Sequence, residues 1–183
     1  YDPTPPAWLD SLGRDWNAAL RFTLPDLDVF ALDATVDPPA KLAAFAGAGT
    51  VLYGLAVNPT SGRVYVANSE ARNEVRFAGG GVLGGTTVRG HLHESRITVI
   101  EPATGAVTPH HLNPHIDYLA VPSPPGVRGR SLPIPVAVAL AGEGRTLYVA
   151  ALGSDKTGIF DTEALEQDAV VPDAASQIAV GGG

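Results

Sequence analysis

The sequence predicts an all-β fold built from repeated four-stranded antiparallel units, and three observations support this prediction. The 21 glycines and 16 prolines among 183 residues are typical of short strands joined by many turns. Two segments, 54–69 and 137–152, repeat one pattern of two strands around a polar turn. Short apolar strands that end in an acidic residue recur at three places in the chain.

The first repeated element is a hairpin. The segments GLAVNPTSGRVYVANS and AVALAGEGRTLYVAAL each contain an apolar strand, a glycine-containing turn and a second strand in which apolar residues alternate. Aligning Tyr65 with Tyr148 also aligns these pairs: Val57 with Leu140, Val64 with Leu147, Val66 with Val149, and Ala67 with Ala150.

The second repeated element is a strand that ends in an acid, as in DVFALDA (28–34), ITVIEPATG (97–105) and TGIFDTEAL (157–165). An acidic side chain at a strand exit accepts backbone N–H bonds and starts a turn, after which a fourth strand returns at AVTPHHL (106–112) and SQIAVGG (176–182). Four antiparallel strands per unit, with the units stacked side by side, form the blades of a β-propeller.

The stretch NPTSGRVYVAN (58–68), with the strand ends VIE and FDT and the closing IAVGG, resembles the bacterial YVTN-type β-propeller repeats, which are related in architecture to NHL and WD40 propellers. The resemblance covers residues 28–183, about two and a half blades, and leaves 1–27 as an N-terminal extension. Ala151 departs from the pattern, since it stands where Asn68 stands in the first copy. The resemblance implies the fold and an extracytoplasmic location, which is periplasmic, cell-surface or secreted.

The repeats are too long for this family, because Tyr65 and Tyr148 lie 83 positions apart whereas such a unit usually has about 40 to 45 residues. The excess divides between 69–95, after the second strand, and 113–133, after the fourth. In a blade whose strands alternate in direction, both of these connections emerge on one face. We therefore expect two long loop insertions on the same face of the propeller segment.

Composition narrows the possible functions. A net charge of −7 argues against a nucleic-acid binder, and the lack of cysteine excludes disulfides and thiolate chemistry within these residues. No apolar run reaches the roughly 20 residues of a membrane span. Two and a half blades leave strand edges open, so the expected partners are the remainder of its own propeller beyond Gly183 or other protein chains.

The five histidines all lie within 91–115, at the bases of the two insertions: His91, His93, His110, His111 and His115. Imidazoles from neighbouring strands can hold a divalent transition metal such as Zn or Cu, with Glu94, Asp117 or Tyr118 as further ligands or supporting partners. If 86–94 is a strand, His91 and His93 share one face and Glu94 lies on the other. The competing interpretation is that these histidines hydrogen-bond irregular chain and brace it.

Arginines form a second candidate site. The insertions contain Arg72, Arg76, Arg89, Arg128 and Arg130, which together with Tyr118 are candidate residues for an anionic ligand. The alternative is that they pair with neighbouring carboxylates such as Glu70 and Glu74.

Two functions follow. The favoured hypothesis is a non-enzymatic binding or assembly module that presents a face with histidines and arginines to a partner or ligand. The alternative is a metal-dependent enzyme or redox component, similar to the lyases and haem-fused proteins known among propellers, that uses the five histidines. No catalytic motif decides between them, because the sequence holds neither a nucleophile elbow nor a phosphate-binding loop.

Overall fold

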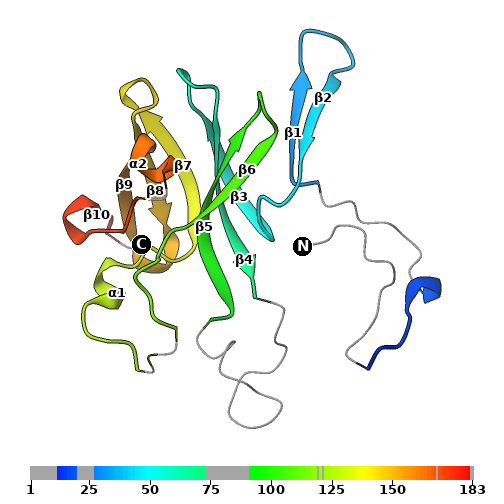
Figure 1. Cartoon of the computed structure of the whole chain (residues 1–183). Coiled ribbons are helices and arrows are strands. Elements are labelled where there is room, and N and C mark those ends of the chain that lie inside the picture. Colours follow the sequence, from blue (N-terminus) through cyan, green and yellow to red (C-terminus); the bar gives the residue numbers. More distant parts are fainter. Residues whose placement is uncertain are drawn as a thin grey trace.

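A computed structural model describes residues 12–19, 27–72, 91–118, 120, 122–167 and 169–181. The described chain forms three antiparallel sheets, and their strands follow the predicted order of a propeller segment (Figure 1). The all-β prediction of about two and a half blades is confirmed. No helix in these ranges is long and apolar enough to cross a membrane.

The half blade is a hairpin of two strands, β1 (Val29–Asp33) and β2 (Ala40–Phe45). It corresponds to the outer two strands of a blade, because it directly precedes the first strand of the next sheet. The short 3-10 turn η1 (Asn17–Ala19) precedes this hairpin in the sequence.

The first blade has the strand order β3-β4-β5-β6, with bounds Val51–Val57, Val64–Ala71, His93–Glu101 and Ala106–His111. The second has the order β7-β8-β9-β10, with bounds Pro135–Ala141, Thr146–Ala151, Lys156–Asp161 and Gln177–Ala179. Its connections hold η2 (Gly142–Gly144), η3 (Leu152–Ser154), α2 (Thr162–Glu166) and η4 (Ala174–Ser176). The predicted repeat holds at the level of register, since Tyr65 pairs with Ala56 and Tyr148 pairs with Ala139.

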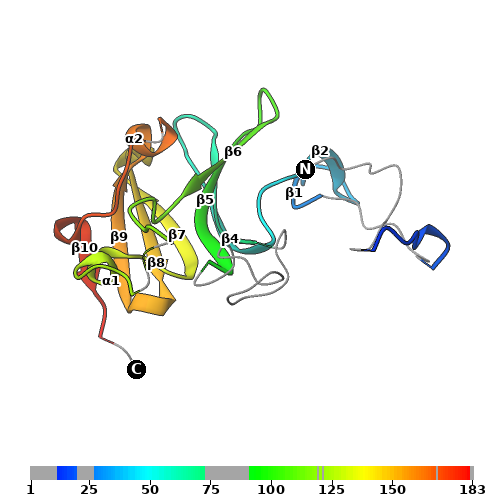
Figure 2. The same ribbon diagram turned by 60° about the horizontal axis from the view of Figure 1, so that its bottom comes forward.

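The main core lies between the two blades. Tyr65, Ile97 and Val99 of the first blade pack against Leu147 and Val149 of the second, and all are buried. A smaller core on the opposite face of the first blade joins it to the β1–β2 hairpin. Figure 2 shows the two blades side by side with the hairpin beyond them. Each blade therefore buries a face only where another sheet covers it.

Polar contacts fasten the two blades at the end opposite to the insertions. Arg63 pairs with Glu101 and with Glu166 of α2, and the Tyr65 hydroxyl donates to the same Glu166 carboxylate. The Asn58 amide donates to the Gly144 carbonyl across the joint at 3.0 Å. Gly144 has a φ of +89°, and a Cβ there would lie 2.1 Å from the Asn58 Oδ1 atom, so only glycine fits this turn.

The two predicted insertions leave the first blade at the same end, as Figure 1 shows. The first connects β4 to β5, and these strands stay paired as far as Ala71 and His93, inside the range 69–95. Residues 73–90 of this insertion, which include most of the predicted strand at 86–94, lie outside the described residues. The second connects β6 to β7 and contains the short helix α1 (Val127–Arg130).

Candidate functional site

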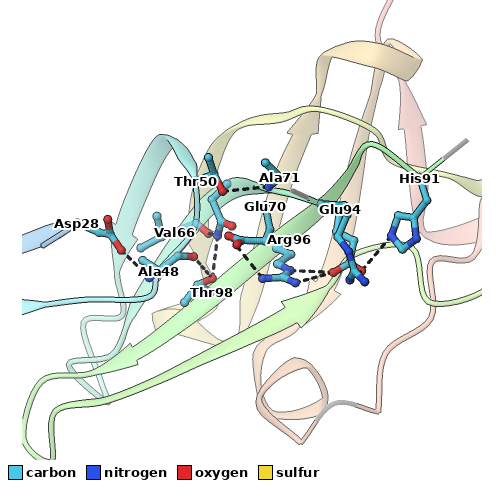
Figure 3. A network of polar contacts seen from close by, with 12 residues as sticks. Asp28, Ala48, Thr50, Val66, Glu70, Ala71, His91, Glu94, Arg96 and Thr98 are labelled. Carbon is cyan, nitrogen blue, oxygen red and sulfur yellow. Dashed lines mark hydrogen bonds and ion pairs between the residues drawn. The ribbon is translucent and has the colours of Figure 1, made fainter. Parts of the chain in front are cut away.

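The two insertions meet at the buried carboxylate of Glu94 on β5. Arg72, directly after β4, donates to its Oε1 atom at 2.6 Å, and Arg96 donates two hydrogen bonds to Oε2 at 3.0 and 2.6 Å. The Nε2 atom of His91 lies 3.0 Å from Oε1. We call Glu94, Arg72, Arg96 and His91 the Glu94 node (Figure 3).

Strand geometry brings these side chains together. Glu94 and Arg96 are two positions apart on β5 and therefore point to the same face of the sheet. The register pairs Glu70 of β4 with Glu94, which places the residue after β4 beside the same carboxylate. Arg72 and His91 both lie within the first insertion, close to where it leaves β4 and where it enters β5, so the node closes its base.

The charges in this region balance. Arg96 also lies 3.7 Å from Glu70, so two guanidinium groups face two carboxylates. Burial pushes the pKa of Glu94 upward, but the hydrogen bond and charge of Arg96, with the charges of His111 and Arg72, outweigh it and hold that pKa below its ordinary value. Glu94 is therefore ionised at neutral pH.

Tyr118 connects the second insertion to the node. Its ring stacks on His91 with 3.5 Å between ring centroids and 6° between the ring planes. Its hydroxyl lies 3.0 Å from Nε2 of His111, the last residue of β6. Burial, with the nearby charge of Glu94, raises the pKa of Tyr118 to about 12 against the opposing effect of Arg72, so the phenol keeps its proton.

Hydrogen-bond partners fix the proton positions on His111 and His91. The Asn113 N–H donates to Nδ1 of His111 at 2.8 Å, so a neutral His111 carries its proton on Nε2 and donates it to Tyr118. His91 likewise directs an Nε2 proton at the Glu94 carboxylate, which can only accept. Burial, followed by the charges of Arg96, His91 and His115, lowers the pKa of His111 against the opposing charge of Glu94.

A second group of contacts closes the base of the second insertion. The Asn113 side chain accepts from the Leu132 N–H at 2.7 Å and donates to the Leu132 carbonyl at 3.1 Å. Ser131 donates its hydroxyl proton to the Val127 carbonyl at 2.7 Å, and His115 Nε2 therefore donates to the same hydroxyl oxygen at 3.0 Å. Burial and then the charge of Arg130 lower the pKa of His115.

The five histidines do not meet as one cluster. His110 and His111 are neighbours on β6 and point to opposite faces, so His110 lies buried in the groove between the blades. His93 is exposed, and His115 binds Ser131. The prediction that Glu94 faces away from His91 is wrong, because β5 begins only at His93 and the irregular chain before it turns His91 toward the carboxylate.

The structure brings together His91, Glu94 and His111, whose ligand atoms all lie within 4.8 Å of one another. Ligand spacing alone would fit a metal. The donor chemistry fits less well, because both imidazoles direct an N–H inward and the Asn113 N–H opposes a proton on Nδ1 of His111. Metal-bound histidines normally donate their other N–H to an acceptor. Metal binding stays a prediction.

The predicted arginines fall into three groups. Arg72 is bound to Glu94, whereas Arg128 and Arg130 on α1 are exposed and make no ion pair with any described residue. Arg76 and Arg89 lie outside the described residues. Asn113 and Ser131 were not among the residues predicted from the sequence, and their only signal is a position near either end of the predicted second insertion.

Comparisons with known proteins give information about the fold but not about the site. No protein-family model matches the chain, and no curated protein matches it in sequence. In structure the chain is similar to a chain of Kuenenia stuttgartiensis hydrazine synthase, with a TM-score of 0.53 and 15% sequence identity. The similarity covers 74% of this chain and 34% of that chain, so the protein described here spans about a third of its length. At this identity the similarity establishes shared fold alone.

Proposed function

We propose that the protein is a non-enzymatic binding module of the YVTN-type propeller class, in which the two insertions act together as one recognition face. The observation that carries this proposal is the stack of Tyr118 on His91, because it joins the second insertion to the first at the Glu94 node. A loop pair tied at its bases keeps its geometry and loses less conformational entropy when it binds a partner.

The chemistry of the face favours an acidic or otherwise anionic partner. Arg72 and Arg96 are occupied by carboxylates, but Arg128 and Arg130 stand exposed on the neighbouring α1 helix. Arginine offers a planar fork of donors that matches carboxylate, sulfate and phosphate groups. We also propose an extracytoplasmic location, on the basis of the repeat resemblance.

The test uses a heparin-derived oligosaccharide as a polyanionic probe in isothermal titration calorimetry with the whole chain. The variant Arg128→Ala/Arg130→Ala should weaken binding by about tenfold or more, because each lost charge-assisted hydrogen bond contributes about 1.5 to 3 kcal/mol. Arg145→Ala is the matched control, since Arg145 is an exposed arginine on the turn between β7 and β8. No binding of the probe, or an equal loss in the control, contradicts the proposed anionic partner.

A second candidate function is the metal-dependent enzyme or redox component. The observation in its favour is the approach of ligand atoms of His91, Glu94 and His111 to within 4.8 Å. Elemental analysis after dialysis without chelator separates the two candidates. Stoichiometric Zn or Cu that disappears in His91→Ala/His111→Ala would place the enzyme or redox function ahead.

A further inference from the structure

The two blades bury equivalent faces to different extents. In the first blade, the face turned toward the second blade carries Tyr65, Ala67, Ile97 and Val99, which are 0 to 6% exposed. The equivalent positions of the second blade are Tyr148, Ala150, Thr157 and Ile159, as the registers of β8 with β7 and β9 show. These four residues are all partly exposed. We call them, together with Ala137, Ala139 and Ile178, the open blade face.

Apart from Thr157, the open blade face consists of aliphatic and aromatic residues. It runs from Ala137 and Ala139 on β7 to Ile178 on β10, which is 49% exposed although it is a large aliphatic residue. Ile178 holds the position that the buried His110 holds in the first blade. A contiguous apolar surface of this kind marks a contact surface.

The repeat identifies what covers such a face. In the first blade the cover is the opposite face of the next blade, with Leu147, Val149 and Phe160. It also supplies the carboxylate of Glu166, on the short helix after its third strand, which accepts from the Tyr65 hydroxyl. Tyr148 repeats Tyr65, whereas Thr146 stands where Arg63 stands, so the second joint would retain the tyrosine contact without the arginine.

We propose that the open blade face binds a further four-stranded blade of this repeat type, one that presents an aliphatic face and a carboxylate for the Tyr148 hydroxyl. A second copy of this chain does not fit as the occupant. The four-stranded aliphatic face that could cover Tyr148 is already buried against the first blade of the same copy. The half blade also exposes an apolar face, with Phe30 and Leu32, but it has only two strands and cannot supply a whole blade.

The test compares two substitutions at equivalent positions, Val99→Glu on the covered face and Ile159→Glu on the open blade face. In the chain itself, Val99→Glu should lower the Tm by about 10 °C or more, because a buried aliphatic position receives a charge, and Ile159→Glu should lower it by less than about 3 °C. The chain is then extended at its C-terminus by a second copy of residues 112–181, which supplies the proposed cover. In the extended protein Ile159→Glu should become as costly as Val99→Glu.

Hydroxyl-radical footprinting of the unsubstituted proteins gives an independent readout that does not depend on the folding of a variant. The extension should protect Tyr148 and Ile159 at least several-fold from oxidation, and Tyr65 should be protected in both proteins. Unchanged labelling of Tyr148, together with an unchanged effect of Ile159→Glu, overturns the proposal. Self-association of the shorter chain that Ile159→Glu abolishes also overturns it, because the occupant would then be a second copy.

Discussion

The two blades share one strand order and one register, and they differ most in the connection between their second and third strands. In the second blade, β8 passes to β9 through the short turn η3. In the first blade, β4 passes to β5 through an insertion whose base is the Glu94 node. A contact that recurs in each blade serves the fold, so the contacts that occur in only one blade are the better guide to function.

The polar contacts at the two ends of the blade joint illustrate the difference. At one end Arg63, Glu101 and Glu166 surround Tyr65, and a tyrosine recurs at that position in the second blade. At the other end Glu94 joins elements that the repeat lacks. As Figure 3 shows, Arg96 contacts both Glu70 and Glu94, while a separate group of contacts joins Asp28, Ala48 and Thr98 near the half blade. Because Glu70 lies on β4 and Arg96 and Glu94 lie on β5, the node is anchored in the blade itself.

The largest effect should come from removing the charge at the centre of the node. Glu94→Gln leaves Arg72 and Arg96 without their carboxylate, and we expect the free energy of unfolding to fall by about 3 kcal/mol, since the Glu94 side chain is only 11% exposed. Urea denaturation measures this change. Glu70→Gln is the matched control and should cost less than about 0.5 kcal/mol, because Glu70 is 34% exposed and 3.7 Å from Arg96.

An equal loss of unfolding free energy in both variants would show that the buried Glu94 stabilises the fold no more than the exposed Glu70. It would contradict the special role that we assign to the node of the first blade.

A smaller effect should follow from removing the contact between the insertions. Tyr118→Ala deletes the stack on His91 and the acceptor of His111, and we expect a loss of about 2 kcal/mol with faster proteolysis of both insertions. Tyr118→Phe keeps the stack and should lose only about 1 kcal/mol. Limited proteolysis followed by mass spectrometry locates the cleavage sites. Faster cleavage of the second insertion alone would contradict the interpretation that the Tyr118–His91 contact holds both insertions in place.

The smallest effect concerns pH. The folded protein lowers the pKa values of His111 and His115 from their ordinary value of 6.5, so the unfolded chain binds these protons more readily. Stability should therefore be constant above about pH 7 and fall as pH drops through 6.5, until the folded pKa values are reached. The loss from Glu94, whose pKa is also lowered, begins only below its ordinary value of 4.5. Thermal melts between pH 5 and 8 measure the first window.

His111→Asn is the control for this window, because its amide oxygen can accept from the Asn113 N–H without titrating. This variant should reduce the pH dependence above pH 5. An unchanged pH profile in this variant would show that the titration of His111 does not cause the loss of stability below pH 7.

The fold was predictable from sequence because strand alternation and turn chemistry repeat around Tyr65 and Tyr148. The side-chain contacts of the site were less so. Residues 91–92 look like a continuation of β5, and only the tertiary contact with Glu94 shows that the strand begins at His93. Asn113 was not predictable as the residue that sets a histidine tautomer, because its backbone N–H and not its side chain does so.

We call the contacts of His91 with Glu94 and Tyr118, and of His111 with Tyr118 and Asn113, the brace at the base of the insertions. Its most direct test is the tautomer of His111, measured by long-range ¹H–¹⁵N NMR at pH 7.5 with and without one equivalent of Zn²⁺. The brace predicts a protonated Nε2 and an unprotonated Nδ1 for His111, unchanged by zinc. A zinc-dependent shift of the ring nitrogens of both His91 and His111, saturating at one equivalent, would contradict the brace and identify a metal centre.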